Sequence, residues 1–190
     1  TEYINLDRYA TTPKTALVGT DKPRLFEGAQ YTIYQLLFPL LLENSNEAAE
    51  TIARNYGRDA FIKQMNAKAK SIGMSNTVFT DPTGLASENV STAEDLFMLS
   101  KYIYNNRSFI FDITSDNVNT RIYGFNGFPD LENKNDFKDN EYFYGGQKGL
   151  TVLKVPVENN SRPITFITLG TASTTESGQV LIDDILGSFK

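Results

Sequence analysis

The chain has 190 residues, of which 40% are hydrophobic and 22% charged, a composition typical of a globular domain and not of a disordered chain. Its net charge is −5 and no cluster of Lys and Arg stands out, which argues against nucleic-acid binding. It contains no Cys and no His, so a Ser-His-Asp triad, a Cys-His pair and a zinc site built on Cys or His are excluded. We expect no metal and no cofactor, and no transmembrane segment, because the longest apolar run (Leu36 to Leu42) is too short to cross a bilayer.

The first clear elements are two successive helices. Thr32 and Gln35 form a possible capping box, so a helix through Leu42 is expected, with Pro39 inside it. A second helix then carries Ala48, Ala49, Ile52, Ala53 and Tyr56 at helical spacing and ends at Gly57.

Two more helices are expected in the middle of the chain. One spans Phe61 to Ile72 and is closed by Gly73. A tight turn follows at Asp81 to Gly84. Ser91 and Glu94 form a second possible capping box, and the helix that they start would bury Leu96, Leu99 and Ile103.

Beyond Asn105 the pattern changes to strands. Val118 to Tyr123 alternates like a strand, and Asn126 to Asn140 is a long polar loop. Leu150 to Val157 and Ile164 to Leu169 predict an antiparallel hairpin. A last helix carries Leu181, Ile182, Ile185 and Leu186, with Gly187 at its end. We therefore predict an α+β fold, a helical cluster packed on a small antiparallel sheet, as a single domain over residues 1–190.

Five stretches carry a more specific pattern in a fixed order. They are Leu36–Ala49, Phe61–Met74, Asn76–Leu85, Asn89–Leu96 and Gly145–Thr151. Together they resemble the serine D-alanyl-D-alanine carboxypeptidases, the low-molecular-mass penicillin-binding proteins that trim peptidoglycan stem peptides. The resemblance implies a penicillin-binding, β-lactamase-like fold and a location outside the cytoplasm, in the cell envelope or secreted. It also implies that the N-terminal part of that fold lies outside residues 1–190, so a preceding segment or a second protein chain would complete the fold.

The resemblance implies three active-site motifs. The first is Ser-x-x-Lys, in which a lysine takes the proton of the nucleophilic serine. This motif is absent from the sequence. Thr11 with Lys14 and Thr151 with Lys154 have a similar spacing, but the first pair flanks Pro13 and the second lies on an expected strand, where the two side chains point to opposite faces.

The second motif, Ser-x-Asn in the family, aligns with Asn44-Ser45-Asn46. Asn46 keeps the family's asparagine, whereas Asn44 stands in place of the serine, and an amide does not relay a proton as a hydroxyl does. The structural alternative is that Asn44 is the N-cap of the second helix, with Glu47 completing a capping box.

The third motif, Lys-Thr-Gly in the family, aligns with Gln147-Lys148-Gly149 on an expected edge strand. Gln147 then holds the lysine position, and Lys148 would face the opposite side unless a bulge at the glycine pair shifts the register. The family lysine would bind the terminal carboxylate of the peptide. The candidate site is therefore Asn44, Asn46, Gln147 and Lys148, with Asn46, Gln147, Lys148, Gly149 and Thr151 as candidate ligand-binding residues.

Two functions follow from these motifs. The first is a cell-envelope homologue of the carboxypeptidases that binds a peptidoglycan stem peptide or a β-lactam but is catalytically impaired, with a groove between the Asn44 corner and the Gln147 strand. The second is an active serine D-Ala-D-Ala carboxypeptidase whose Ser-x-x-Lys lies on an upstream segment. A weaker third is a protein-interaction module that uses the acidic surface and the aromatic-rich loop from Tyr123 to Tyr144.

Overall fold

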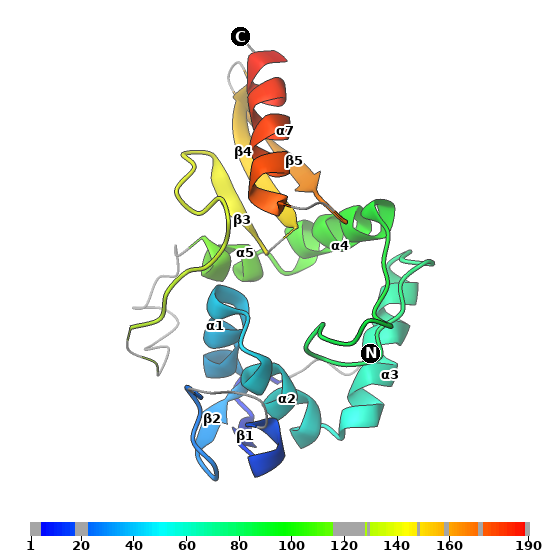
Figure 1. Cartoon of the computed structure of the whole chain (residues 1–190), viewed down its shortest axis with the longest axis vertical. Coiled ribbons are helices and arrows are strands. Elements are labelled where there is room, and N and C mark those ends of the chain that lie inside the picture. Colours follow the sequence, from blue (N-terminus) through cyan, green and yellow to red (C-terminus); the bar gives the residue numbers. More distant parts are fainter. Residues whose placement is uncertain are drawn as a thin grey trace. The chain divides into compact units, whose positions relative to one another are not determined.

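The computed structural model describes residues 5–17, 23–115, 128, 130–147, 149–157, 160–170 and 173–188 (Figure 1). In chain order the elements are β1 (Tyr9–Thr11), η1 (Lys14–Ala16), β2 (Gln30–Thr32), α1 (Ile33–Glu43), α2 (Asn46–Asn55), α3 (Arg58–Ser71), α4 (Ala93–Asn106), α5 (Phe109–Thr114), β3 (Phe143–Gln147), β4 (Leu150–Val157), β5 (Asn160–Ile167) and α7 (Thr174–Ser188). The expected α+β class is confirmed. The expected strand at Val118 to Tyr123 lies outside the described residues.

The chain forms two compact units that interleave along the sequence. Unit 1 contains residues 1–70, 77–90 and 119–132, and unit 2 contains residues 71–76, 91–118 and 133–190. The prediction of a single partial domain over residues 1–190 stays a prediction.

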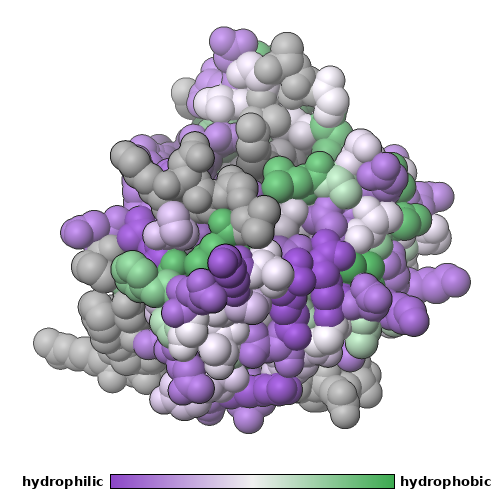
Figure 2. Space-filling model, turned by 60° about the horizontal axis from the view of Figure 1, so that its bottom comes forward, coloured by the Kyte–Doolittle hydropathy of each residue, from purple (hydrophilic) through white to green (hydrophobic). Residues whose placement is uncertain are grey.

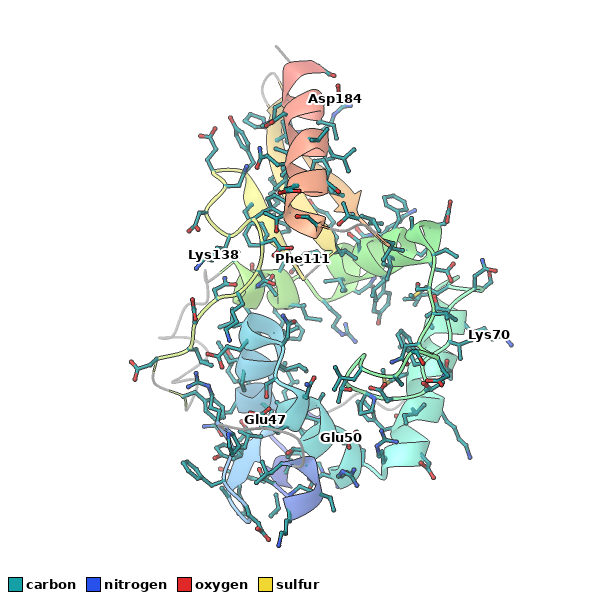
Figure 3. The ribbon with its side chains drawn as sticks, in the orientation of Figure 1. Glu47, Glu50, Lys70, Phe111, Lys138 and Asp184 are labelled. Carbon is teal, nitrogen blue, oxygen red and sulfur yellow. The ribbon has the colours of Figure 1, made fainter. Side chains whose placement is uncertain are left out.

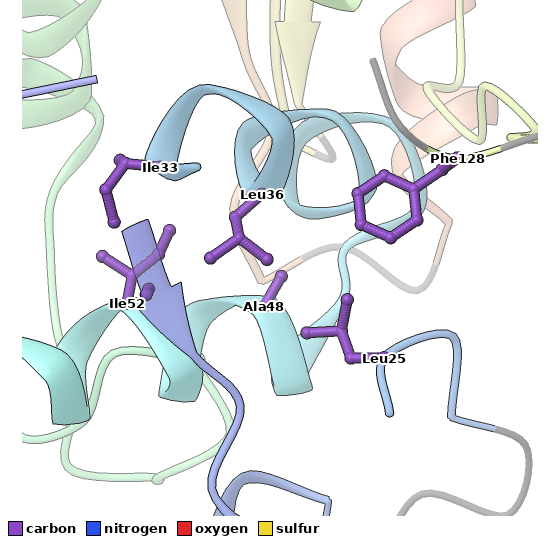
Figure 4. Packing of buried hydrophobic residues seen from close by; sticks show 7 residues of the cluster. Leu25, Ile33, Leu36, Ala48, Ile52 and Phe128 are labelled. Atoms are coloured by element: carbon purple, nitrogen blue, oxygen red, sulfur yellow. The ribbon is translucent and has the colours of Figure 1, made fainter. Parts of the chain in front are cut away.

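Unit 1 is built around helices α1 and α2. Thr32 Oγ1 accepts a hydrogen bond from Gln35 N, and Gln35 Oε1 accepts one from Thr32 N, so the expected capping box is confirmed. The core of the unit is a cluster of buried apolar side chains (Figure 4): Ala10, Leu25, Ile33, Leu36, Ala48, Ile52 and Phe128. Leu36 of α1 is fully buried in this cluster.

Unit 2 is a sheet with helices on both faces. Among the described residues the sheet has the order β3-β4-β5, and both pairs are antiparallel, which confirms the expected hairpin. Leu153 and Val155 pack with Ile182 of α7 on one face. Leu150 and Val152 pack with Phe111 and its neighbours from α4 and α5 on the other. Even-numbered and odd-numbered residues of β4 therefore point to opposite faces of the sheet. This agrees with the expectation that the side chains of Thr151 and Lys154 point to opposite faces.

Helix α4 begins one residue later than the sequence predicts. Its N-cap is Thr92, whose Oγ1 accepts a hydrogen bond from Asp95 N at 3.2 Å, so the expected capping box of Ser91 and Glu94 is wrong. Asp95 is buried and its Oδ2 accepts a hydrogen bond from Asn76 N at 2.8 Å. This contact fixes the first turn of α4 in the register that makes Thr92, and not Ser91, the cap.

Candidate functional site

The corner between α1 and α2 begins at Asn44. This residue ends α1 in the left-handed conformation, with φ 56° and ψ 41°, and its side chain is exposed. Asn is among the residues that tolerate this conformation best. The expectation that Asn44 is the N-cap of the next helix is therefore wrong: Asn44 caps the C-terminus of the preceding one.

The N-cap of α2 is Ser45. Its Oγ accepts a hydrogen bond from Ala48 N at 3.1 Å, and the side chain is buried. Glu47 is thereby moved to the second helical position, one residue short of a capping box. Asn46 is the first residue of α2 and is half-buried. At this corner the side chain of Asn44 is therefore exposed, while the hydroxyl of Ser45 is buried and caps the N-terminus of α2.

Two carboxylates flank this corner, and both bind the segment at Arg24. Arg24 Nε and Nη2 donate to Glu43 Oε2 and Oε1 at 2.7 and 2.6 Å, and Arg24 N donates to Glu47 Oε1 at 3.2 Å. Glu132 N also donates to Glu43 Oε1 at 3.0 Å. Glu47, labelled in Figure 3, is buried. Sequence reasoning missed this arrangement because nothing near Arg24 in the sequence indicates its partner.

Strand β3, which carries the third motif, is an edge strand of the unit 2 sheet in the described part of the chain, as expected. Its register pairs Gly145 with Val152, Gly146 with Thr151 and Gln147 with Leu150, and the register shifts between Phe143 and Gly145. A bulge is therefore present just before the glycine pair, close to where the sequence allowed one. Lys148 and the side chain of Gln147 lie outside the described residues.

The turn from β3 to β4 places the remaining candidate residues. Gly149 has φ +82°, a conformation that favours glycine in a tight hairpin. Thr151 is only 6% exposed. The roles of Gly149 and Thr151 in ligand binding stay predictions.

Helix α5 contacts the same strand through a buried polar network that the sequence did not reveal. Gly146 N donates to Thr114 Oγ1 at 3.1 Å. Asn133 Nδ2 and Asn135 Nδ2 donate to Thr114 O at 2.8 and 3.3 Å. These amides supply partners to a carbonyl at the end of α5, where no helical partner is available.

The candidate residues thus fall into two groups. Asn44 and Asn46 belong to unit 1, whereas Gln147, Gly149 and Thr151 belong to unit 2. The groove expected between them stays a prediction. Among the described residues, no helix is long and apolar enough to cross a membrane, and no group of acidic side chains is suited to hold a metal ion.

Comparisons with known proteins point to one family. The family model described as D-alanyl-D-alanine carboxypeptidase (peptidase S11) matches residues 3–152. The D-alanyl-D-alanine endopeptidase of Escherichia coli K12 is 54% identical over 66 residues, which cover 34% of this chain and 21% of that protein. The D-alanyl-D-alanine endopeptidase of Pseudomonas aeruginosa is 46% identical over 78 residues, 40% of this chain and 25% of that protein. The matched part is thus about a quarter of the length of these relatives.

A solved structure supports the fold over a longer stretch. Penicillin-binding protein D2 of Listeria monocytogenes, in an ampicillin-bound form, matches with a TM-score of 0.73 at 22% identity. The match covers 96% of this chain and 77% of that one. At this level of identity the likeness supports the fold, and a penicillin-binding fold is what the five stretches predict.

Proposed function

The chain belongs to the D-alanyl-D-alanine carboxypeptidase family, and on this premise we propose that it binds the D-Ala-D-Ala end of peptidoglycan stem peptides, or a β-lactam, with impaired acyl transfer. The proposal places the terminal carboxylate at the Gln147 position of β3. Because Gln147 is neutral, it would offer hydrogen bonds and no ion pair, so binding should be weak. We also propose a location outside the cytoplasm, where peptidoglycan is found.

The arrangement of the Asn44-Ser45 corner carries this proposal. In the family, a serine at the Asn44 position supplies a hydroxyl that can relay a proton, which an amide does not do. Asn44 has an amide there and is held by the left-handed cap of α1. Ser45 does not replace the missing hydroxyl, because its Oγ accepts the hydrogen bond from Ala48 N and its side chain is buried.

The test uses the full-length natural protein and a labelled penicillin. Intact-mass measurement should find no covalent adduct, while titration with a short peptide ending in D-Ala-D-Ala should give saturable binding in the millimolar range. A covalent adduct would reject impaired acyl transfer. Absence of both adduct and peptide binding would reject the binding function itself.

The alternative is an active enzyme that has its Ser-x-x-Lys outside residues 1–190. The relatives named as endopeptidases favour it, since identity to them reaches 54% over 66 residues. Under this alternative, Asn44→Ser should acylate faster than the unmodified protein, because a hydroxyl relays a proton and an amide does not. Asn44→Ala is the matched control, because it removes the amide without adding a hydroxyl.

We further propose that a preceding segment or a second protein chain completes the fold. Among its described residues, unit 2 exposes four large apolar side chains, Phe97, Leu169, Val180 and Leu181. On the face drawn in Figure 2, hydrophilic residues predominate and hydrophobic ones form small separate groups. Co-purification of residues 1–190 with the upstream part of the gene product, expressed as a separate chain, would test the completion. Failure to associate, with both parts folded, would reject it.

A further inference from the structure

The corner formed by residues 44–46 lies between two carboxylates that contact one and the same residue. Glu43 directly precedes the corner and Glu47 directly follows it. The Arg24 guanidinium donates two hydrogen bonds to Glu43, at 2.7 and 2.6 Å, and Arg24 N donates one to Glu47 Oε1 at 3.2 Å. Arg24 therefore holds both ends of the corner, one through its side chain and the other through its backbone.

Arg24 is itself anchored in the core of unit 1. The next residue, Leu25, is fully buried and belongs to the same apolar cluster as Leu36 of α1 and Ala48 of α2 (Figure 4). The two-point contact with Glu43 is partly buried, and such a contact fixes direction as well as distance. The segment at Arg24 thus contacts both helices where α1 passes into α2.

The backbone of the corner is also held by one carbonyl group of α1. Asn44 N and Ser45 N both donate to Pro39 O, the latter at 3.1 Å. The side-chain amides of Asn44 and Asn46, by contrast, make no hydrogen bond within the part of the chain that the structure describes. The corner therefore combines a fixed backbone with two amide side chains that its own structure does not use.

We propose that Arg24 is a positioning residue for the second motif: it fixes the direction in which the amides of Asn44 and Asn46 are presented to a ligand. The inference rests on the proposed function, which has a peptide or a β-lactam bind beside this corner. A binding group has to be held within about 0.5 Å of its productive position by the residues that support it. Arg24 supplies this support without touching the ligand.

The effect on the corner is measured without a ligand by amide hydrogen exchange. In the unmodified protein the amides of Asn44 and Ser45 should be protected, because both are bonded to Pro39 O. Arg24→Gln should speed their exchange about tenfold more than that of the Ile52 amide in the middle of α2, because only the corner loses a contact. Exchange of the two corner amides at the rate of open amides in the unmodified protein would overturn the inference. So would an equal change at all three amides in the variant.

Glu50 supplies a matched control on the same helix. Its carboxylate pairs with Arg54 and Arg58 at 2.8 and 3.0 Å and is 14% exposed, close to the 12% of Glu43. Glu43→Gln should reproduce the effect of Arg24→Gln on the corner and carries the same test if Arg24→Gln does not fold. Glu50→Gln should leave exchange at the corner unchanged relative to the middle of α2. An equal effect of the two glutamate variants on the corner would overturn the inference.

The effect on binding is measured by titrating the full-length protein with a peptide that ends in D-Ala-D-Ala. Arg24→Gln and Glu43→Gln should each weaken binding about fivefold, and the double variant should be no weaker than either, since both changes remove one contact. Arg24→Lys keeps the charge without the two-point contact, so it should recover only part of the affinity. Glu50→Gln should bind the peptide as the unmodified protein does.

The direction of the Glu43→Gln effect separates position from charge. Removal of a negative charge would by itself favour a peptide that carries a carboxylate, so tighter binding by this variant would overturn the positioning role. Unchanged affinity in folded Arg24→Gln, or full recovery in Arg24→Lys, would also overturn it and leave the proposed function standing. Absence of peptide binding by the unmodified protein would instead overturn the proposed function, and the positioning role with it.

Discussion

Arg24 and Glu43 form a two-point ion pair, with N–O distances of 2.7 and 2.6 Å, directly beside the corner at Asn44. Glu43 is the last residue of α1, where the helix dipole disfavours a negative charge. The Arg24 guanidinium offsets this, and the same carboxylate accepts a hydrogen bond from Glu132 N. The Glu43 carboxylate thus joins the end of α1 to two other segments of unit 1, one at Arg24 and one at Glu132.

Removing this pair should cost more than removing an ordinary surface charge. The Arg24 and Glu43 side chains are 29% and 12% exposed, so solvent screens the pair only in part. We expect Arg24→Gln to lower the free energy of unfolding by about 1–2 kcal/mol, measured by urea titration. Lys63→Gln removes the same charge from an exposed position on α3 and should cost less than about 0.5 kcal/mol. Equal losses in the two variants would show that the pair contributes nothing specific.

The left-handed backbone conformation of Asn44 predicts that a glycine is tolerated at this position. Because its φ is +56°, Asn44→Gly should change stability by less than about 0.5 kcal/mol, whereas Asn44→Val should cost about 1–2 kcal/mol in thermal or urea unfolding. Asn106 is the matched control, since it is the last residue of α4 and helical, so that glycine there should cost up to about 1 kcal/mol. A large loss in Asn44→Gly would mean that the amide, and not the backbone conformation, stabilises the corner.

Local signals predicted the helices well but not which of two neighbouring residues caps them. At Thr32 one good N-cap residue is followed by Gln35, and the capping box is observed. At Asn44 and Ser45, and again at Ser91 and Thr92, two cap-forming residues are adjacent, and in both cases the second is the N-cap. Propensity ranks such residues almost equally. Contacts made by the folded unit decide between them, and the sequence pattern does not contain those contacts.

The polar contacts around both candidate motifs could not be predicted from the sequence either, because their partners lie far apart along the chain. Arg24 and Glu43 are 19 positions apart, as are Thr114 and Asn133, and Thr114 and Gly146 are 32 apart. Each of these separations is longer than any described helix or strand, so periodicity within one element does not indicate the contact. The glycine pair at Gly145 and Gly146 was a visible signal, but only the fold shows that its purpose is the close approach of α5.

Asp81 predicts an acid-dependent loss of stability. Burial raises the pKa of this carboxyl, but hydrogen bonds from Thr83, Ala86 and Asn89 outweigh it, so the pKa lies well below its usual range. A pKa lowered in the folded state gives stability that is present above the unfolded value of about 3.9 and is lost as the pH falls through the folded value. We expect Asp81→Asn to cost about 1–3 kcal/mol at pH 7, because an amide has one acceptor oxygen in place of two.

The difference between the unmodified protein and Asp81→Asn should narrow as the pH falls below about 4, as followed by urea unfolding at a series of pH values. Asp59→Asn, an exposed carboxylate in the first turn of α3, is the control and should show only a small effect over the same range. A difference for Asp81→Asn that stays constant from pH 7 to pH 2 would contradict the assigned cause.

Helix α7 contains two glycines for which the structure predicts opposite outcomes. A Cβ at Gly178 would lie 2.5 Å from Phe137 Cζ, whereas nothing lies within 4 Å at Gly187. Alanine adds up to about 1 kcal/mol of helix propensity at either position. At Gly178 the clash with a ring packed in the core should outweigh this, and we expect a net loss of about 1–3 kcal/mol. Gly187→Ala should be neutral or slightly stabilising.

Thermal unfolding of the two variants gives the sign of each effect, and a double variant identifies the clash. Phe137→Leu shortens the side chain that meets the new methyl group, so Gly178→Ala should cost less in the Phe137→Leu background than alone. If the two losses simply add, the methyl group does not meet Phe137, and the packing of α7 on this part of unit 2 differs from that described. Coupling of more than about 0.5 kcal/mol places Gly178 and Phe137 in direct contact in solution.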